Sequence, residues 1–551
     1  MMPRHTDLQS CSRRCARASF AILACAGLFP AGAAKGTATG APARDWPTFN
    51  GSYSSERYSR LAEIDTENVG NLRRLCTFDT GEVAKSFESG PVVVDGVLYV
   101  TTDMVTYAVD AATCALRWKH THRYEPPSFL GVNRGVAFEG GRLFRGSGDG
   151  HVFAIDAKTG RSLWDVAIAD PARGETVPLA PVAWNGMVFA GNAGGDIFGV
   201  TGRVYALSAE DGRVLWQFDV VPDSGPARAT WPASPNVPLT GGATWTSYSL
   251  DADRGILYIP TGNPAPDFAL ELRPGDNLYT NSVVALDART GELLAFVQPT
   301  KNDFHDYDLA AAPALITTRS GQRLAIAAGK DGFVYGIDRS AVGRGGDPAS
   351  PLAIRYRTAA TTQLDTDTPL STERGVRFCP GILGGTQWNG PAYHPGHDLV
   401  IVPAVDWCST VKLAPLETLQ PQPGEAWTGA VPDAAFGNFD PQEQWGGWLT
   451  AIDAETGHVR WRYRSPTPML AGVTTTAGGL VFTGDLDGDF LAFDAGNGAI
   501  LWREHIGQPM GAGVVTFEVD GRQRIAVGTG KPSPVWPVES DSARVVVFGL
   551  P

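Results

Sequence analysis

The sequence predicts an all-β fold, an eight-bladed β-propeller made of four-stranded antiparallel blades. Two observations predict it: a phrase of the form Ala-x-Asp-x-x-x-Gly-x-x-x-Trp recurs along the chain, and short alternating strands surround each copy. In each copy an apolar strand ends in an Asp–Gly turn, and the following strand carries the Trp. A single hairpin cannot bury this Trp, so neighbouring copies must stack into a closed ring.

Seven copies of the phrase are recognisable in chain order. They begin at Ala108, Ala154, Ala206, Ala285, Gly336, Ala451 and Ala492. A further blade-sized stretch, residues 393–407, has strand and turn signals without the phrase, and it brings the expected number of blades to eight. Eight blades over residues 46–551 give about 63 residues each, against ~40–45 in a WD40 blade. Long loops must hold the surplus, and such loops are usually functional.

Composition limits the possible partners. The 551 residues carry a formal net charge of −13, which argues against nucleic acid or an anionic membrane surface. Length alone would allow several domains, but a closed propeller is one cooperative ring. We therefore expect one domain, residues 45–551.

The N-terminus, residues 1–34, has the pattern of a cleaved export signal. Three arginines precede an apolar run, residues 18–29, and a small-residue cleavage site follows at residues 31–33. The run is shorter than the ~20 residues needed to span a bilayer. We expect a periplasmic protein without a transmembrane segment in the mature chain, with lipid attachment at Cys25 as the alternative.

Four cysteines remain after the predicted cleavage: Cys76, Cys114, Cys379 and Cys408. An even number in an oxidising compartment indicates disulfide bonds, and four cysteines allow three connectivities. We favour Cys76–Cys114 and Cys379–Cys408, because each of these pairs lies within one or two blades. The sequence contains no Cys-x-x-Cys-His motif, so we expect no attached c-type haem.

Between the repeats lie segments that blade scaffolding does not require. In chain order they are FESGPVVVDGVLYVTT (from Phe87), VNRGVAF (from Val132), GNAGGDIFGVTG (from Gly191), TGGATWTSYSLD (from Thr240), TGNPAP (from Thr261), RPGDNLYTNS (from Arg273), FHDYDLAAAP (from Phe304), GKDGFVYGIDR (from Gly329) and CPGILGGTQWNGPAY (from Cys379). With the Trp repeats, they resemble the quinoprotein alcohol dehydrogenases, nearest to the lupanine-hydroxylase-like branch. The resemblance runs from about residue 46 to the C-terminus. It implies an eight-bladed propeller that holds pyrroloquinoline quinone and a metal ion on its axis.

The resemblance also implies a set of metal-binding residues. Asp196 and Asn263 match the family's carboxylate and amide ligands, although methanol dehydrogenases have Glu at the first position. Asp306 matches the catalytic base, and apolar residues interleave with the acidic ones around it, unlike a solvated acidic loop. Asp308 adds a carboxylate on the same face of an extended segment. Oxygen ligands suit Ca²⁺, and the extra carboxylate suits a lanthanide, so both ions stay open.

The quinone requires a flat apolar surface and nearby positive charge. Trp245 lies outside the repeat register and is expected to stack under the ring, the alternative being one more packing Trp. Lys330 matches the cation at the quinone's reactive oxygens, where negative charge develops. The resemblance assigns the other cofactor contacts to Glu88, Arg134, Ser147, Gly194, Gly195, Gln387, Trp388 and Trp536. Arg134 fits best, because a guanidinium pairs with a carboxylate through two hydrogen bonds.

One departure from the family concerns the cover of the quinone. Many members have a disulfide between adjacent cysteines just before VNRG, whereas this chain has PSFLG at residues 127–131. We expect Phe129 or Leu130 to cover the ring instead. Two long stretches, residues 341–378 and 412–447, are expected to form loops over the mouth of the site.

These features predict oxidation of an alcohol, with Asp306 removing the hydroxyl proton and hydride passing to the quinone. Since no haem motif is present, a separate cytochrome c or similar carrier is expected to accept the electrons. Two alternatives remain. One is a non-catalytic propeller of the outer-membrane assembly type, which would have no reason to keep Asn263, Asp306, Lys330 and Arg134 together. The other is a quinoprotein that hydroxylates a heterocyclic substrate.

Overall fold

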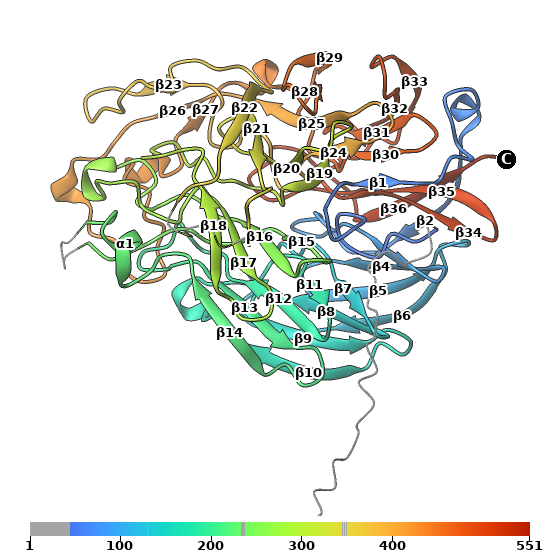
Figure 1. The fold of residues 1–551 in the computed structure, drawn as a ribbon, viewed down its shortest axis with the longest axis horizontal. Coiled ribbons are helices and arrows are strands. Elements are labelled where there is room, and N and C mark those ends of the chain that lie inside the picture. The colour runs from blue at the N-terminus through green and yellow to red at the C-terminus, as the bar shows by residue number, and fades with distance from the viewer. Residues whose placement is uncertain (1–43, 129, 233–236, 344, 346–347, 349) are drawn as a thin grey trace, which may run out of the picture. The chain divides into compact units, whose positions relative to one another are not determined.

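A computed structural model describes residues 44–128, 130–232, 237–343, 345, 348 and 350–551. The predicted signal, residues 1–34, and Phe129 lie outside this part. The described chain is nearly all β, and its main feature is eight sheets of four antiparallel strands, one of which is extended by the parallel strand β1 (Tyr58–Ser59) (Figure 1). The innermost strands of neighbouring sheets contact one another, as β7 does with β11 and β30 with β34. The predicted eight-bladed propeller is therefore confirmed.

Each blade has four strands, lettered A to D from the centre of the ring outward. Blades 1 to 4 are β3 (Val92–Val94), β4 (Val97–Thr101), β5 (Val105–Asp110), β6 (Leu116–Thr121); β7 (Ala137–Glu139), β8 (Arg142–Gly146), β9 (His151–Asp156), β10 (Ser162–Ala167); β11 (Val182–Trp184), β12 (Met187–Gly191), β13 (Arg203–Ser208), β14 (Val214–Asp219); and β15 (Ser249–Asp251), β16 (Ile256–Pro260), β17 (Val283–Asp287), β18 (Leu293–Val297). Blades 5 to 8 are β19 (Ala314–Thr317), β20 (Arg323–Ala328), β21 (Phe333–Asp338), β22 (Ile354–Ala359); β24 (Ala392–His394), β25 (Leu399–Asp406), β28 (Gly446–Asp453), β29 (Val459–Ser465); β30 (Thr474–Thr476), β31 (Leu480–Gly484), β32 (Asp489–Asp494), β33 (Ile500–His505); and β34 (Val514–Val519), β35 (Arg522–Thr529), β36 (Arg544–Gly549), β2 (Arg73–Asp79).

The remaining elements are short. They are strands β1 (Tyr58–Ser59), β23 (Val376–Phe378), β26 (Ser409–Val411) and β27 (Asn438–Phe439), the helix α1 (Gly225–Arg228), and the 3₁₀ turns η1 (Val69–Asn71), η2 (Pro171–Arg173), η3 (Leu270–Leu272), η4 (Leu416–Thr418), η5 (Pro432–Ala434) and η6 (Gln442–Gln444). No helix in the described ranges is both long and apolar enough to cross a bilayer.

The repeated phrase encodes contacts between blades. Trp164 on the D strand of blade 2 donates its indole N–H to the carbonyl oxygen of Ala209 in blade 3, at 3.1 Å. Its ring lies against Gly212, where an added Cβ would come within 2.6 Å of the indole. Trp118, Trp216 and Trp461 make the same hydrogen bond to the next blade. The Gly and the Trp of the phrase are therefore partners across successive copies.

The closing blade differs from the prediction. Residues 393–407 form β24 and β25, the inner half of blade 6, whose outer half is the copy at Ala451. The eighth blade has no copy of the phrase: its three inner strands come from the C-terminus, and its outer strand is β2, which pairs with β36. The prediction that residues 393–407 form the eighth blade is wrong. Strand pairing between the two ends of a chain leaves no local pattern in the sequence.

A disulfide takes the place of the Trp–Gly contact at this seam. Cys76 follows a register shift on the outer strand β2, the position that Trp164 has on β10. Cys114 occupies the Gly position of the first copy and has a φ of 60°. The two cysteines are bonded, as predicted, with 5.9 Å between their Cα atoms. The bond fixes the outer strand of blade 8 to blade 1, whereas the two ends of the chain meet through the backbone pairing of β2 with β36.

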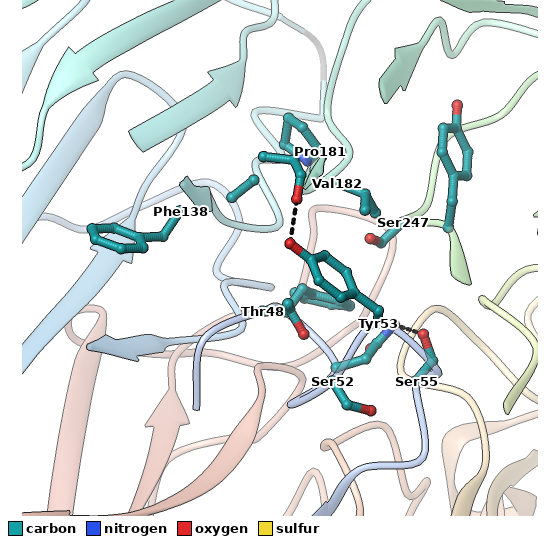
Figure 2. Close-up of a pocket in the computed structure, with 13 residues that line it drawn as sticks. Thr48, Ser52, Tyr53, Ser55, Phe138, Pro181, Val182 and Ser247 are labelled. Carbon is teal, nitrogen blue, oxygen red and sulfur yellow. Dashed lines mark hydrogen bonds between the residues drawn. The ribbon is translucent and has the colours of Figure 1, made fainter. Parts of the chain in front are cut away.

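The segment from Trp46 to Ser59 fills the centre of the ring. Its backbone pairs with the A strands of several blades: Tyr53 O accepts from Leu250 N, Glu56 O from Tyr393 N, and β1 runs parallel to β30. Figure 2 shows Tyr53 donating to the carbonyl oxygen of Ala183, at 2.6 Å. The pocket around it has only about 10 Å³, room for one water at most. The recess around Tyr53 is therefore almost completely filled.

An insertion forms a small three-stranded sheet, β23–β26–β27, held by the second predicted disulfide, Cys379–Cys408. Its apolar residues, among them Phe378 and Val411, pack against Tyr307 and Phe268. The prediction of a loop at residues 341–378 is wrong in part, because β22 within it is the D strand of blade 5.

Candidate active site

The predicted site residues come from the connections at one end of the ring. In an antiparallel blade the B–C and D–A connections lie at the same end. Asp196, Asn263 and Lys330 lie in B–C connections, and Trp245 and Asp306 in D–A connections. Two backbone hydrogen bonds join neighbouring connections: Gly242 N to Asn263 O, and Gly262 N to Ala243 O, both 2.8 Å. The fold therefore gathers segments that are far apart in the sequence.

Lys330 is the centre of a buried ion-pair network. Its Nζ lies 2.9 Å from Asp306 Oδ1 and 2.8 Å from Asp308 Oδ2. The other oxygen of Asp308 accepts the backbone N–H of Asn263, at 3.0 Å. Burial alone would lower the pKa of Lys330, but the two carboxylates outweigh it and raise that pKa above its usual range. The ammonium group is therefore charged at any physiological pH.

Asp306 is held in a strained turn. Its φ is 63°, a conformation that residues other than Gly rarely adopt and that often marks functional sites. The turn is fixed by Asp303, whose carboxylate accepts the N–H of His305 (3.0 Å) and of Tyr307 (2.9 Å). Burial raises the pKa of Asp306 well above its ordinary value, Asp308 raises it further, and Lys330 opposes the rise. A carboxylate of raised pKa suits a general base.

A further carboxylate in this network, Asp267, was not predicted. It is fully buried, and its Oδ1 accepts the side-chain N–H of Asn263 at 3.1 Å. Its Oδ2 has no hydrogen-bond partner among the described residues. Burial raises its pKa well above the ordinary value, and Asp196 and Asp306 raise it further. The signal in the sequence was an acid directly after TGNPAP, in an otherwise apolar stretch.

Arg273 fixes the two loops that carry these acids. It is buried and donates to the carbonyl oxygens of Pro266 (2.8 Å), Asp267 (2.9 Å) and Asp303 (2.6 Å). The motif that begins at Arg273 is recognisable in the sequence, but the sequence did not predict that Arg273 holds the two loops together. Because both loops depend on one guanidinium, their relative position is set by backbone contacts.

Asp196 is half-buried at the edge of the network. Burial raises its pKa to about 6, Asp308 adds to the rise, and Lys330 and a hydrogen bond with Asn263 oppose it. Its carbonyl oxygen accepts the N–H of Trp427, at 2.7 Å, so the long connection before β28 is fixed against it. The stretch 412–447 therefore contacts the site directly.

The donor set fits a hard cation. Three carboxylates, of Asp196, Asp306 and Asp308, and the amide of Asn263 provide the oxygen ligands that Ca²⁺ and similar ions require, with Asp267 behind the amide. In the described residues no three His, Cys, Asp or Glu side chains converge closely enough to hold an ion as they stand. The ammonium group of Lys330 lies between Asp306 and Asp308 instead. The surplus of negative charge over one lysine is what a bound cation would balance.

A second part of the site is built from Arg134 and two tryptophans. The guanidinium of Arg134 lies 4.7 Å from the ring centre of Trp245 and 5.6 Å from that of Trp388. It pairs with Glu88 at 2.6 Å and donates to the carbonyl oxygen of Trp245 at 2.9 Å. Its Nε is buried without a partner in the described structure. Flat rings beside a cation with a free donor fit a planar, carboxylated cofactor.

Glu88 shares the environment of Arg134. Burial raises its pKa to about 7, and Arg134 opposes the rise. The pair is therefore close to the balance between an ion pair and a neutral acid at physiological pH, and a bound anion at Arg134 would compete with Glu88.

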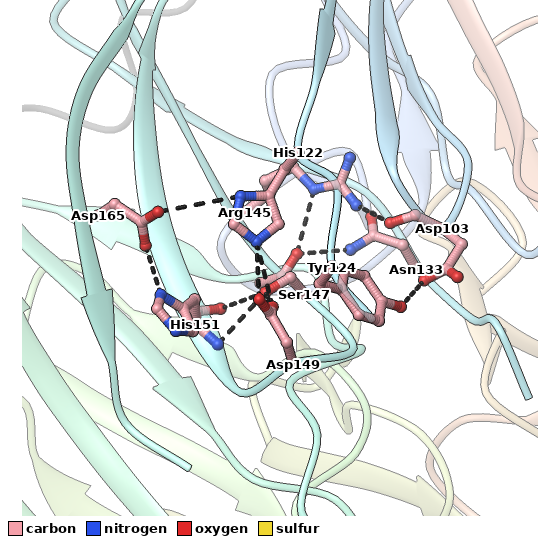
Figure 3. A network of polar contacts seen from close by, with 10 residues as sticks. Asp103, His122, Tyr124, Asn133, Arg145, Ser147, Asp149, His151 and Asp165 are labelled. Atoms are coloured by element: carbon pink, nitrogen blue, oxygen red, sulfur yellow. Dashed lines mark hydrogen bonds and ion pairs between the residues drawn. The ribbon is translucent and has the colours of Figure 1, made fainter. Parts of the chain in front are cut away.

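Ser147 lies in a separate polar network, shown in Figure 3. Its hydroxyl group bonds to Asp149 and to the carbonyl oxygen of His151, at 3.3 Å. Asp149 also contacts His122, 3.0 Å away. Nearby Asn133 bonds to the backbone of Gly146, at 2.9 Å. Ser147 therefore lies near Arg134 in the fold, but its hydroxyl group already has hydrogen-bond partners within the protein.

The other predicted contacts are distributed around this core. Gly195 approaches Ala243 so closely that a Cβ would lie 3.0 Å from the alanine Cβ, and a Cβ at Gly194 would lie 2.6 Å from Gly174 O. Gln387 is buried, and its side chain donates to Gly384 O at 2.9 Å. Trp388 and Trp536 belong to one apolar cluster with Trp245. Leu130 is 40% exposed, and its role as a cover of the quinone stays a prediction.

Comparison with known proteins agrees with this geometry. Residues 46–352 match the family model described as the β-propeller domain of glucose, ethanol and alcohol dehydrogenases that use PQQ. The chain is 32% identical over 522 residues to quinohemoprotein alcohol dehydrogenase ADH-IIG of Pseudomonas putida, covering 88% of this chain and 72% of that protein. The chain belongs to the PQQ-dependent alcohol dehydrogenase family. It is therefore a quinoprotein oxidoreductase.

Other relatives support the family assignment. The chain is 31% identical over 523 residues to quinoprotein alcohol dehydrogenase PedH of P. putida, covering 87% of this chain and 85% of that one. Among solved structures, a europium-containing methanol dehydrogenase superposes with a TM-score of 0.80 at 26% identity, over 92% of this chain and 98% of that one. Residues 444–545 also match the model of the outer membrane protein assembly factor BamB, which fits the shared blade repeat.

Proposed function

We propose that residues 45–551 of this PQQ-dependent dehydrogenase oxidise an alcohol in the periplasm, after removal of the signal in residues 1–34. The observation that carries the proposal is the buried network of Asp306, Lys330 and Asp308, at the same end of the ring as Arg134. A scaffold propeller would have no use for it, because burying charged groups costs several kcal/mol per ion unless they are well paired.

Asp196, Asn263, Asp306 and Asp308 would hold the ion, Ca²⁺ or a lanthanide. Arg134 and Glu88 would bind the carboxylate edge of pyrroloquinoline quinone, and Trp245 would stack under the ring. When bound, the quinone supplies a carbonyl carbon that accepts hydride, and the ion supplies the Lewis acidity that polarises this carbonyl.

The chain's own groups move the proton and fix the charges. Asp306 takes the proton of the substrate hydroxyl group at its carboxylate, and burial, by raising its pKa, makes it a stronger base. Lys330 stabilises negative charge that develops beside it. Asp303 and Arg273 hold the loop of Asp306 in place through backbone bonds.

The test is reconstitution. The protein is incubated with the quinone and either Ca²⁺ or La³⁺, and dye reduction is followed with primary, secondary and polycyclic alcohols, including a heterocyclic substrate. We expect turnover with at least one alcohol and one ion. Asp306→Asn should keep the absorbance of the bound quinone and lower turnover by ~10²–10⁴-fold. Binding of the quinone without turnover on any substrate, or full activity in the variant, would contradict the proposal.

A further inference from the structure

A groove of about 400 Å³ opens on the same face of the ring as the candidate site. It lies over blades 6 to 8, and the connections that form it are of the B–C and D–A types, like those of the site. Its apolar wall is made by Trp445, Leu486, Pro509, Pro537 and Val538. The groove and the candidate site are therefore formed by the same end of the ring.

An apolar cluster rich in tryptophan connects this groove to the candidate cofactor contacts. Trp245, Trp388, Trp407, Trp445 and Trp536 belong to one apolar cluster. The ring centre of Trp407 lies 6.2 Å from that of Trp536 and 5.4 Å from that of Trp445. The cluster thus begins at the rings beside Arg134 and ends at the groove wall.

The rim of the groove is acidic. Asp487 and Glu539 line it and are exposed, and no Lys or Arg is among its lining residues in the described structure. Glu443 and Asp541, also exposed, are neighbours of lining residues in the sequence. An acidic rim around an apolar wall attracts and orients a partner of opposite charge, and it accelerates association at low salt.

We propose that this groove docks a small, basic protein that carries one electron and removes the electrons of the reaction. The proposal rests on the proposed function: oxidation of one alcohol releases two electrons and two protons. Each carrier takes one electron, so two carriers dock in turn, and the protons pass to solvent. Contacts of this kind are small and transient.

The experiment compares two double variants of equal charge. Asp487→Lys with Glu539→Lys reverses the rim, and Glu210→Lys with Asp253→Lys makes the same change at exposed turns on the opposite face. A basic cytochrome c serves as the probe. Its binding is measured by calorimetry at low salt, and its reduction is followed in the reconstituted enzyme beside that of a small neutral dye.

The rim variant should bind the cytochrome at least tenfold more weakly than the wild type, and the salt dependence of reduction should flatten. The control variant should stay within about twofold, and dye reduction should be the same in all three proteins. Equal binding by wild type and rim variant, or equal loss in the control, would overturn the docking site. If the reconstituted wild type does not reduce the dye, the proposed function is contradicted instead. Calorimetry then still tests whether the groove binds the cytochrome.

Discussion

One buried network holds four aspartates and one lysine: Asp196, Asp267, Asp306, Asp308 and Lys330. A buried carboxylate is costly unless it is paired and hydrogen-bonded. One ammonium group cannot pair with all of them, and Asp267 keeps one oxygen without a partner. The arrangement is destabilising by itself, so we infer that it is retained for the ligand that completes it.

Asp267 is expected to orient Asn263 for cation binding. Its Oδ1 accepts the amide N–H, which leaves the amide oxygen free to face an ion. Removing such an outer partner typically lowers metal affinity about 10–100-fold. We therefore expect Asp267→Asn to weaken Tb³⁺ binding by that factor, measured by luminescence sensitised by the nearby tryptophans. Asp398→Asn, a buried aspartate in an A–B turn at the other end of the ring, is the control. Identical titrations of both variants would exclude the role.

Asp485 gives a pH dependence of stability outside the site. It is buried, and burial raises its pKa to about 6 from 3.8. Because the folded-state pKa is the higher one, the folded chain keeps a proton that the unfolded chain releases between these values. Stability therefore falls as pH rises through this window, by about 3 kcal/mol in all.

Asp485→Asn removes this charge but keeps an acceptor for the N–H groups of Asp487 and Asp489. Relative to the wild type, the variant should gain about 3 kcal/mol between pH 4 and pH 8. Urea unfolding at a series of pH values measures it, and parallel curves for the two proteins would disprove it.

At the scale of the blade, the repeated phrase specifies how neighbouring blades pack. The Trp of one copy packs on the Gly of the next, so each copy takes part in two contacts, one through its Trp and one through its Gly. This explains why the turn requires Gly beyond its positive φ. It also explains why Tyr356, on the D strand of blade 5, lies against Gly457 of blade 6 in the same way.

Two glycines of equal φ separate the backbone effect from the contact. Gly212 and Gly186 both have a φ of 75°, but a Cβ at Gly212 would meet Trp164, whereas one at Gly186 would meet open space. Gly186→Ala should cost about 1 kcal/mol through backbone strain. Gly212→Ala should cost about 1–3 kcal/mol more through overpacking. Thermal unfolding measures the stability lost in each variant, and equal losses of stability would rule out the Trp–Gly contact between blades as the reason for Gly212.

Local pattern explains what the sequence could predict. Seven blades were found because each copy of the phrase is one hairpin. The closing blade was misplaced because β2 and β36 lie far apart in the chain. Asp306 and Lys330 were predicted from motifs that resemble a family. Asp267 and Arg273 were missed, because their roles come from contacts between loops, and neither position stood out as a match.

At the scale of the whole ring, closure depends on one seam. Each of seven blades is built from one stretch of the chain, whereas the eighth joins the two ends of the chain through the pairing of β2 with β36. The disulfide Cys76–Cys114 stands where four other seams have a Trp on a Gly, and it bonds β2 to blade 1. The covalent bond therefore fixes the strand on which the closing pair depends.

Replacing both cysteines of the seam with alanine should lower stability by about 3–4 kcal/mol, given the 38-residue separation. The loss should be local: hydrogen exchange should accelerate in β2 and β36 before the other blades. The matched control is the Cys379–Cys408 pair in the insertion, whose removal should leave exchange in β2 unchanged. Uniform acceleration around the ring in the first variant would contradict a special role for the seam.

The clasp between Cys76 and Cys114 also makes maturation depend on redox conditions. In a reducing environment these two thiols stay free, and the outer strand of blade 8 is held to blade 1 by hydrogen bonds and apolar packing alone. In an oxidising space the bond forms and fixes this strand. With the proposed export to the periplasm, this last step of assembly would follow export, and protein made in the cytosol would be looser and more easily digested.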